Sequence, residues 1–265
     1  MNITNYVKVT SVAEAYELNQ KHNAVVLGGC CWLRLSPKRV IGTAIDLSGL
    51  GLDTVEETPT EIRLGCMVTL RQMETSDLLA ALTQGALQDA LRHIVGVQFR
   101  NLATIGGSIC GRFGFSDLWT LFLAMDGEVE LYKAGRMKLS DFAARGAERD
   151  IVTHVILPKV NGRTAYESLR LSATDFPIIA CAASCANGQL RCAIGARPQR
   201  AELVPAGSEL LSQGFTEAAV AAYARQAVEA LTFGANLRAT AAYRKEMAAV
   251  LCKRVLKRLA EEGER

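Results

Sequence analysis

Two pairs of consecutive glycines could hold a charged ligand without help from charged side chains. The pair Gly28-Gly29 follows the apolar run Ala24–Leu27, and the pair Gly106-Gly107 lies much further along the chain. Consecutive glycines let a backbone come close to a ligand, and successive exposed amides form a concavity that binds phosphate. Each pair alone is also consistent with a tight turn. Two such loops together could hold the two phosphates of a dinucleotide.

Acid–base and histidine–metal chemistry have few candidate residues. The three histidines, His22, His93 and His154, are scattered along the chain, which argues against a multi-histidine metal site or a Ser-His-Asp triad. His154 lies in an alternating, strand-like stretch, where a neighbour can satisfy the imidazole without a metal. The usual dinucleotide, P-loop, zinc-protease and hydrolase motifs are absent. We therefore predict no catalytic side chain.

The cysteines raise the question of a metal cluster. Their irregular spacing in a long chain favours free thiols over a disulfide framework. Cys181 and Cys185 fall in one predicted strand, where four residues span about 13 Å, too far for two ligands of one iron. We predict buried structural thiols and no metal site. The eight cysteines are Cys30, Cys31, Cys66, Cys110, Cys181, Cys185, Cys192 and Cys252.

Composition narrows the partners. The 265 residues include 30 Lys and Arg against 27 Asp and Glu, a net charge of +3, so no nucleic-acid partner is predicted. No apolar run approaches the roughly 18 residues of a membrane helix. The N-terminus lacks the pattern of a secretory signal. We expect a cytoplasmic protein without a membrane partner.

Periodicity and turn signals predict an α+β chain. The segment from Arg100 to Asp117 holds too many glycines for an ordinary helix, and Asn187-Gly188 predicts a two-residue hairpin turn. Predicted strands cover about 6–9, 24–27, 44–47, 54–57, 61–65, 128–132, 137–139, 151–157, 165–171, 178–186 and 190–194. Predicted helices cover about 11–21, 69–76, 85–94, 118–125, 204–213, 216–231 and 239–260.

The order of these motifs resembles one family. The stretch Val25–Trp32 carries the first glycine pair, and Arg100–Asp117 carries Arg-Asn-x-Ala-Thr-Ile-Gly-Gly-Ser followed by Ser-Asp-Leu. The segment Leu237–Arg244 resembles an Arg-Ala-Ser-x-x-Tyr-Arg signature. Together they are similar to the FAD-binding medium subunits of the molybdenum hydroxylases, of the xanthine dehydrogenase and carbon monoxide dehydrogenase type. The resemblance covers nearly the whole chain.

This resemblance implies a fold and a binding site for FAD. It implies an FAD-binding α/β domain over 1–148, with subdomains of about 1–52 and 53–148. A C-terminal domain of small antiparallel sheet and helices follows over 149–265. The glycine loops would hold the pyrophosphate, Asp117 the nucleotide end, and Ile94 and Val152 would approach the flavin. The implied cofactor-binding residues are Leu27, Gly28, Gly29, Cys30, Cys31, Ile94, Thr104, Ile105, Gly106, Gly107, Ser108, Asp117, Val152 and Arg170.

The resemblance also implies an oxidoreductase subunit that works in a complex. Electrons would pass from a molybdenum-cofactor subunit, through a 2Fe-2S subunit, to FAD and then to NAD or another acceptor. A homo-oligomer is an option for the isolated chain. Two alternatives stay open: an assembly or scaffold subunit without FAD, and an independent flavin oxidoreductase that shares the fold.

Two departures from the family pattern bear on the site. Cys30 and Cys31 stand where the family commonly has Thr or Ser, so a hydroxyl hydrogen bond is lost while backbone binding survives. The family's lysine and paired arginines near the start of the C-terminal domain are reduced to one cation, Arg170. Arg170 would either replace that lysine at the flavin or lie on the surface.

Overall fold

The chain folds into two compact units, each assembled from separate stretches of sequence. A computed structural model describes residues 2–35, 40–146, 149–205, 207–212 and 214–261. Unit 1 consists of residues 1–73, 97–111 and 127–158, and unit 2 consists of residues 74–96, 112–126 and 159–265. Each unit has its own sheets and its own apolar core, and each is described separately below.

A three-stranded parallel sheet begins unit 1. Its strand order is β1-β3-β2, and helix α1 connects β1 to β2. Side chains cap the start of this helix: the N-cap Ser11 hydroxyl accepts a hydrogen bond from the Glu14 amide at 3.1 Å, and the Glu14 carboxylate accepts one from the amide of Thr10, the residue before the N-cap, at 2.8 Å. These contacts satisfy amides at the start of the helix. The elements are β1 (Asn2–Lys8), α1 (Val12–Asn19), β2 (Ala24–Leu27) and β3 (Val40–Asp46).

The second sheet of unit 1 has five antiparallel strands in the order β4-β5-β8-β6-β7. The strand β8, which was expected to open the C-terminal domain, instead pairs with β5 on one side and β6 on the other. Helix α6 (Ile105–Cys110) packs against β5 and β8. The strands are β4 (Val55–Glu57), β5 (Glu61–Gly65), β6 (Glu128–Leu131), β7 (Gly135–Lys138) and β8 (Val152–Pro158), and the other helices of the unit are α2 (Leu70–Glu74), α5 (Val97–Arg100) and α8 (Leu139–Ala144).

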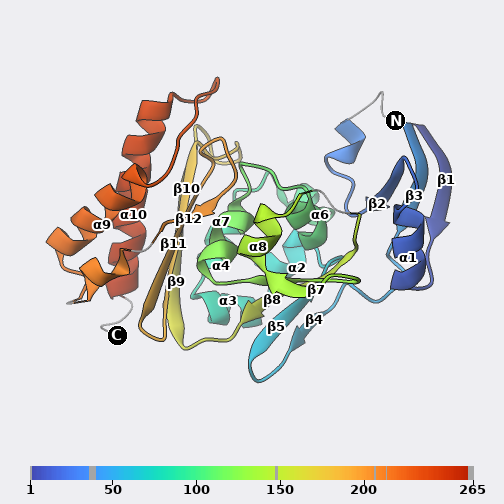
Figure 1. The fold of residues 1–265 in the computed structure, drawn as a ribbon, viewed down its shortest axis with the longest axis horizontal. Coiled ribbons are helices and arrows are strands. Elements are labelled where there is room, and N and C mark those ends of the chain that lie inside the picture. The colour runs from blue at the N-terminus through green and yellow to red at the C-terminus, as the bar shows by residue number, and fades with distance from the viewer. Residues whose placement is uncertain (1, 36–39, 147–148, 206, 213, 262–265) are drawn as a thin grey trace. The chain divides into compact units, whose positions relative to one another are not determined.

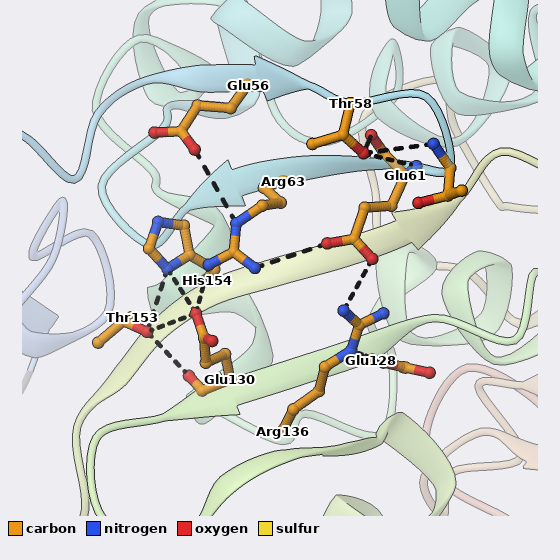
Figure 2. A network of polar contacts seen from close by, with 10 residues as sticks. Glu56, Thr58, Glu61, Arg63, Glu128, Glu130, Arg136, Thr153 and His154 are labelled. Atoms are coloured by element: carbon orange, nitrogen blue, oxygen red, sulfur yellow. Dashed lines mark hydrogen bonds and ion pairs between the residues drawn. The ribbon is translucent and has the colours of Figure 1, made fainter.

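The two faces of this sheet differ because neighbouring residues of a strand point to opposite sides. One face is apolar and buried, with Ile62, Val129 and Val155 fully inaccessible to solvent. The other face carries a charged network, defined by Glu56, Glu61, Arg63, Glu128, Glu130, Arg136, Lys138 and His154 and drawn in large part in Figure 2.

Arg63 lies at the centre of the charged network. Its guanidinium is 2.5 Å from a Glu130 oxygen, 3.6 Å from Glu61 and 3.9 Å from Glu56. Burial alone would raise the pKa of Glu130, but the hydrogen bond and charge of Arg63 outweigh it and lower that pKa. The His154 imidazole lies 3.1 Å from Glu130. The prediction of a strand histidine satisfied by its neighbours is therefore confirmed.

Unit 2 is built on a four-stranded antiparallel sheet in the order β12-β11-β10-β9. Asn187 and Gly188 both have positive φ, 51° and 73°, as the predicted tight hairpin turn requires. Helices cover both faces: α4 and α7 lie on one side of the sheet and α9 and α10 on the other (Figure 1). The strands are β9 (Gly162–Leu169), β10 (Ile179–Ala186), β11 (Gln189–Gly195) and β12 (Glu202–Leu203), and the helices are α3 (Asp77–Thr83), α4 (Ala86–Leu91), α7 (Asp117–Ala124), α9 (Glu217–Glu229) and α10 (Ala241–Glu261).

The long helix α10 joins this sheet through an apolar stripe. Ala248, Cys252 and Leu256 recur at four-residue intervals and are fully buried, which is the spacing of one helix face. They meet the side chains of β10 and β11 that point away from α7, including Cys181 and Ile194. This packing forms the main core of unit 2.

Three local predictions differ from the structure. Helix α6 forms despite its two glycines, and glycine is needed at position 106 because a Cβ there would lie 2.6 Å from the Cys66 carbonyl oxygen. The predicted helix over 204–213 is reduced to a short 3-10 turn, η2 (Ser208–Leu211), while positions 206 and 213 lie outside the described residues. Helices α3, α5 and α8, the strand β12 and the 3-10 turn η1 (Leu33–Leu35) were not predicted.

The helices give no sign of a membrane span. Within the described ranges, no helix combines the length and the apolarity that crossing a bilayer requires.

Replacing Arg63 with methionine tests the charged network. In Arg63→Met the carboxylates of Glu56, Glu61 and Glu130 lose their common cation, so the Glu130 pKa should rise. A lowered folded-state pKa contributes stability above the unfolded value of 4.5, and this contribution is lost as the pH falls below it. We expect roughly 1 kcal/mol lower stability at neutral pH and a smaller difference in acid, measured by urea unfolding at several pH values.

Arg136→Met is the matched control. Arg136 contacts Glu61 and Glu128 but is more exposed, with 43% of its side chain accessible against 22% for Arg63. Its effect should be smaller. Equal effects of the two variants at every pH would contradict the central place given to Arg63.

Candidate functional site

The first glycine loop follows the strand β2 and contains a residue in the left-handed backbone conformation. Leu27 ends β2 and pairs with Asp46. Neither Gly28 nor Gly29 has a φ in the left-handed region that glycine alone adopts readily. That conformation is found instead at Cys30, whose φ is 56°. A non-glycine residue with positive φ is uncommon and is typical of a constrained turn or a functional segment.

The second glycine loop opens helix α6. Thr104 is the N-cap residue, and its hydroxyl accepts a hydrogen bond from the Gly107 amide at 3.2 Å. Ile105 and Gly106 are buried, whereas Gly107 is exposed. The Ser108 hydroxyl donates back to the Thr104 carbonyl at 3.0 Å. The second loop is therefore the first turn of a helix with Gly107 on its open side.

The two loops lie directly against each other, and glycine is required for this contact. A Cβ atom on Gly29 would lie 1.7 Å from the Leu102 carbonyl oxygen, and one on Gly28 would lie 2.7 Å from the Thr104 hydroxyl oxygen and 3.7 Å from the Gly107 Cα. Real Cβ atoms do not approach other atoms as closely as the first two of these distances. The structure thus brings together two segments that are roughly 75 residues apart in the sequence. The hypothesis that both loops hold one dinucleotide requires this proximity.

The backbone amides of the two loops differ in their availability. The Ile105 amide donates to the Val68 carbonyl and the Gly106 amide to the Cys66 carbonyl, both at 2.9 Å. Among the residues that the structure describes, no acceptor is found for the amides of Gly29 and Cys30. Gly29 and Cys30 are half-buried, so their amides are the donors that the first loop leaves available.

The side chains of Cys30 and Cys31 form hydrogen bonds within the first loop. The Cys30 thiol donates to the Gly28 carbonyl at 3.3 Å, and the Cys31 thiol donates to the Gly29 carbonyl at 3.5 Å. Burial raises the pKa of Cys30, with help from the charge of Asp46. Both thiols therefore stay protonated and act as hydrogen-bond donors. They occupy the positions at which the family commonly has the hydroxyl group of Thr or Ser.

Val152 also belongs to unit 1. It is 7% exposed and lies in β8, which packs against α6. The next residue, Thr153, accepts a hydrogen bond from the Cys66 amide at 2.8 Å, and the Cys66 carbonyl in turn accepts from Gly106. A chain of backbone hydrogen bonds thus connects the strand of Val152 to the second glycine loop.

Asp117 and Arg170 are partners in unit 2. An Arg170 guanidinium nitrogen donates to Asp117 Oδ1 at 2.6 Å, and the buried Tyr166 hydroxyl donates to the same oxygen. Burial raises the pKa of Asp117, and Arg170 and Tyr166 oppose that rise. Only 7% of the Arg170 side chain is exposed, so the alternative of a surface cation is wrong.

This pair extends to the C-terminal signature. Arg170 also donates to the Asp175 carbonyl at 2.6 Å, and the Asp175 carboxylate pairs with Arg238 at 2.9 Å. Arg238 in turn lies over the Phe176 ring, 4.9 Å from its centroid. Sequence reasoning missed Tyr166 and Asp175, because nothing in the spacing of 49 residues between Tyr166 and Asp117 indicates that they meet.

Ile94 lies in a strained segment of unit 2. It follows α4 and is half-buried. The next residue, Val95, has a φ of 52°, which is costly for a β-branched side chain and is typical of functional segments. Its contact with a ligand stays a prediction, as do the contacts of Asp117 and Arg170.

Comparison with known proteins places these loops in a family. The family model described as the FAD binding domain in molybdopterin dehydrogenase matches residues 2–160, which is more than half of the chain. The model described as the CO dehydrogenase flavoprotein C-terminal domain matches residues 164–259. The first segment contains all the candidate cofactor-binding residues except Arg170, and Arg170 lies in the second segment.

Individual relatives are similar over nearly their whole length. The nicotine 6-hydroxylase medium subunit of Paenarthrobacter nicotinovorans is 24% identical and covers 95% of each chain. Quinoline 2-oxidoreductase from Pseudomonas putida 86 has a TM-score of 0.89 at 18% identity, covering 100% of this chain and 99% of that one. The carbon monoxide dehydrogenase of Hydrogenophaga pseudoflava has a TM-score of 0.87 at 24% identity, with 97% of each chain covered.

Gly29→Ala tests the contact between the loops. The added methyl group would overlap the Leu102 carbonyl, so the loops must separate. We expect a loss of about 1–3 kcal/mol, the range of other overpacked sites, measured by urea unfolding.

Gly146→Ala serves as the control, because a Cβ there meets nothing within 4 Å and the backbone has no positive φ. It should unfold like the parent chain. Parent-like stability of Gly29→Ala would show that the loops are not held together through this glycine.

Proposed function

Since this chain belongs to the FAD-binding flavoprotein family of the molybdopterin dehydrogenases, we propose that it is the subunit through which a molybdenum hydroxylase complex delivers electrons to an acceptor. The chain is a medium-subunit flavoprotein of that family, and its cofactor is FAD. The proposal concerns the route of the electrons. They would arrive from the iron–sulfur clusters of a partner and leave FAD for NAD or another acceptor.

The observation that carries the proposal is the contact between the two glycine loops. Gly28 and Gly29 pass so close to Thr104 and Leu102 that a side chain at either glycine would collide with the second loop, so the backbones of the two loops form one continuous surface. The amides of Gly29 and Cys30 lack acceptors among the described residues. A pyrophosphate carries acceptor oxygens and negative charge, so it fits this surface without a lysine or arginine. The residues present therefore fit FAD.

When bound, FAD supplies the redox chemistry, accepting and releasing one or two electrons. The chain's own residues would hold and orient it. The amides of Gly29 and Cys30 would donate to the pyrophosphate, and Thr104 and Ser108 would form the wall beside it. No side chain needs to act as acid, base or nucleophile, which agrees with the scattered histidines.

The remaining predicted contacts form part of the proposal. We assign Asp117 to the nucleotide end of FAD, and Ile94 and Val152 to the flavin. Asp117 Oδ1 is already engaged by Arg170 and Tyr166, so Oδ2 is the oxygen assigned to the ligand. Arg170 then serves chiefly to hold Asp117, and it acts in place of the family's lysine through that carboxylate.

The partners follow from the division of chemistry. A molybdenum-cofactor subunit would select and oxidise the substrate, and a 2Fe-2S subunit would connect it to this chain. Relatives are named for nicotine, quinoline and carbon monoxide, so substrate choice varies widely within one medium-subunit fold. An FAD-free scaffold is the alternative, and the colour of the purified chain separates the two, because flavin absorbs visible light.

Gly107→Val tests where the pyrophosphate lies. A Cβ at Gly107 meets only the Thr104 hydroxyl, at 3.2 Å, so the fold should survive. The side chain would occupy the space of the phosphate, and FAD affinity should fall at least tenfold, measured by flavin fluorescence titration. The parent chain should bind one FAD and release FAD, not FMN, on denaturation.

Circular dichroism provides the control for folding in this experiment. Full flavin occupancy in a folded Gly107→Val chain would place the pyrophosphate elsewhere. A colourless parent chain after reconstitution with FAD would favour the scaffold alternative.

The isolated chain should be unable to hydroxylate a substrate. At most, reduced pyridine nucleotide should reduce its flavin and then an artificial dye. Hydroxylation should appear only when the molybdenum and iron–sulfur subunits are co-expressed. Steady-state assays of the chain alone and of the complex measure this, and comparable turnover by the chain alone would assign it an independent enzymatic role.

A further inference from the structure

Three thiols from distant parts of the sequence meet in the core of unit 2. Cys181 lies on β10, Cys192 on β11 and Cys252 on α10. The Cys192 Sγ is 3.8 Å from that of Cys181 and 4.0 Å from that of Cys252, and all three sulfurs lie within 4.8 Å of one another. All three are free cysteines. We call this group the thiol triad.

The triad is closed to solvent and surrounded by apolar side chains. Cys181 and Cys252 are 0% exposed and Cys192 is 1% exposed. Val255, Ala227 and Ile194 belong to the same buried cluster. The charged side chains that act on the thiols are Glu167 and Lys253, which have opposite signs. The surroundings therefore offer no net charge that could balance the charge of a bound ion.

The spacing of the sulfurs matches that of three ligands around one atom. Three sulfur bonds of roughly 2.3 Å to one ion hold the sulfurs about 4 Å apart when the ion lies in their plane, and about 3.5 Å apart when a lone pair places the ion above that plane. The two contacts of Cys192, at 3.8 and 4.0 Å, lie near the upper end of this range, so the sulfurs need to move together by only a few tenths of an ångström around an ion with a lone pair. A disulfide needs sulfurs about 2.05 Å apart, so the triad is not arranged as a bonded pair.

Charge then selects the class of ion. Three thiolates around monovalent copper leave two negative charges in an apolar core, and around zinc they leave one charge and call for a fourth ligand. An unpaired buried charge is strongly unfavourable. Around a trivalent ion the three thiolates give a neutral complex, and an ion with a lone pair needs no fourth ligand.

We propose that Cys181, Cys192 and Cys252 together bind one trivalent thiophilic ion of the arsenic class. Arsenous acid exchanges its three hydroxyl groups for three thiols: three As–O and three S–H bonds break, and three As–S bonds and three waters form. The arsenic stays trivalent throughout, so no oxidant or reductant is involved. The bound ion cross-links β10 and β11 to α10. This inference is independent of FAD binding.

The test is to add arsenite to the full-length chain, both in the native state and during refolding, because the buried triad has to open for entry. Native mass spectrometry gives the stoichiometry, and X-ray absorption gives the sulfur neighbours of arsenic. We expect one arsenic per chain with three sulfur ligands, and slower uptake by the native chain than during refolding.

Substitutions identify the ligands. Cys192→Ala, which removes the thiol that contacts both others, should abolish the three-sulfur signature and weaken binding at least tenfold. Cys252→Ala should do the same and provides a second variant if the first does not fold. Cys185→Ala, on the same strand as Cys181, should leave binding unchanged.

The adjacent pair Cys30 and Cys31 is the competing dithiol, and the double variant Cys30→Ser/Cys31→Ser removes it. That variant should keep the three-sulfur signature. No arsenic on the folded parent chain, a two-sulfur site lost with Cys30 and Cys31, or a three-sulfur site that persists in Cys192→Ala would each overturn the proposal.

Discussion

The close contact between two glycine loops is the constraint on which the binding function of unit 1 depends. At Gly29 the backbone passes so near the Leu102 carbonyl that even a methyl group cannot be accommodated. The parallel sheet β1-β3-β2 positions one loop and the sheet around β8 positions the other. Neither loop carries a charged side chain. The chemistry offered to a ligand is that of backbone amides, and their direction is set by the fold.

Much of this arrangement could be predicted from sequence, but the role of individual groups could not. Glycine pairs, capping residues and the Asn187-Gly188 turn act over a few residues, so local patterns reveal them. Which amides are free depends on carbonyls far away, such as those of Cys66 and Val68. Likewise, the burial of Arg170 depends on its ion pair with Asp117, a residue 53 positions earlier in the sequence. The placement of β8 between β5 and β6 is a long-range pairing of the same kind.

The two units carry different polar features. Unit 1 has the available amides of the first glycine loop and a charged sheet face, and unit 2 has a group of ionic contacts that runs from Tyr166 through Asp117 to Arg238. The core of unit 2 is itself unusual because its centre holds three thiols. Small buried sulfurs allow α10 to approach the sheet closely, and their convergence was invisible in sequence because 60 residues separate Cys192 from Cys252.

Amide hydrogen exchange with and without FAD shows whether the first glycine loop donates to the pyrophosphate. The amides of Gly29 and Cys30 should exchange readily in the free chain and become protected when FAD binds. The amides of Ile105 and Gly106, which already donate within the protein, should be protected in both states. Unchanged exchange at Gly29 and Cys30 in a chain saturated with FAD would contradict the account, because the first loop would then not be the donor to the pyrophosphate.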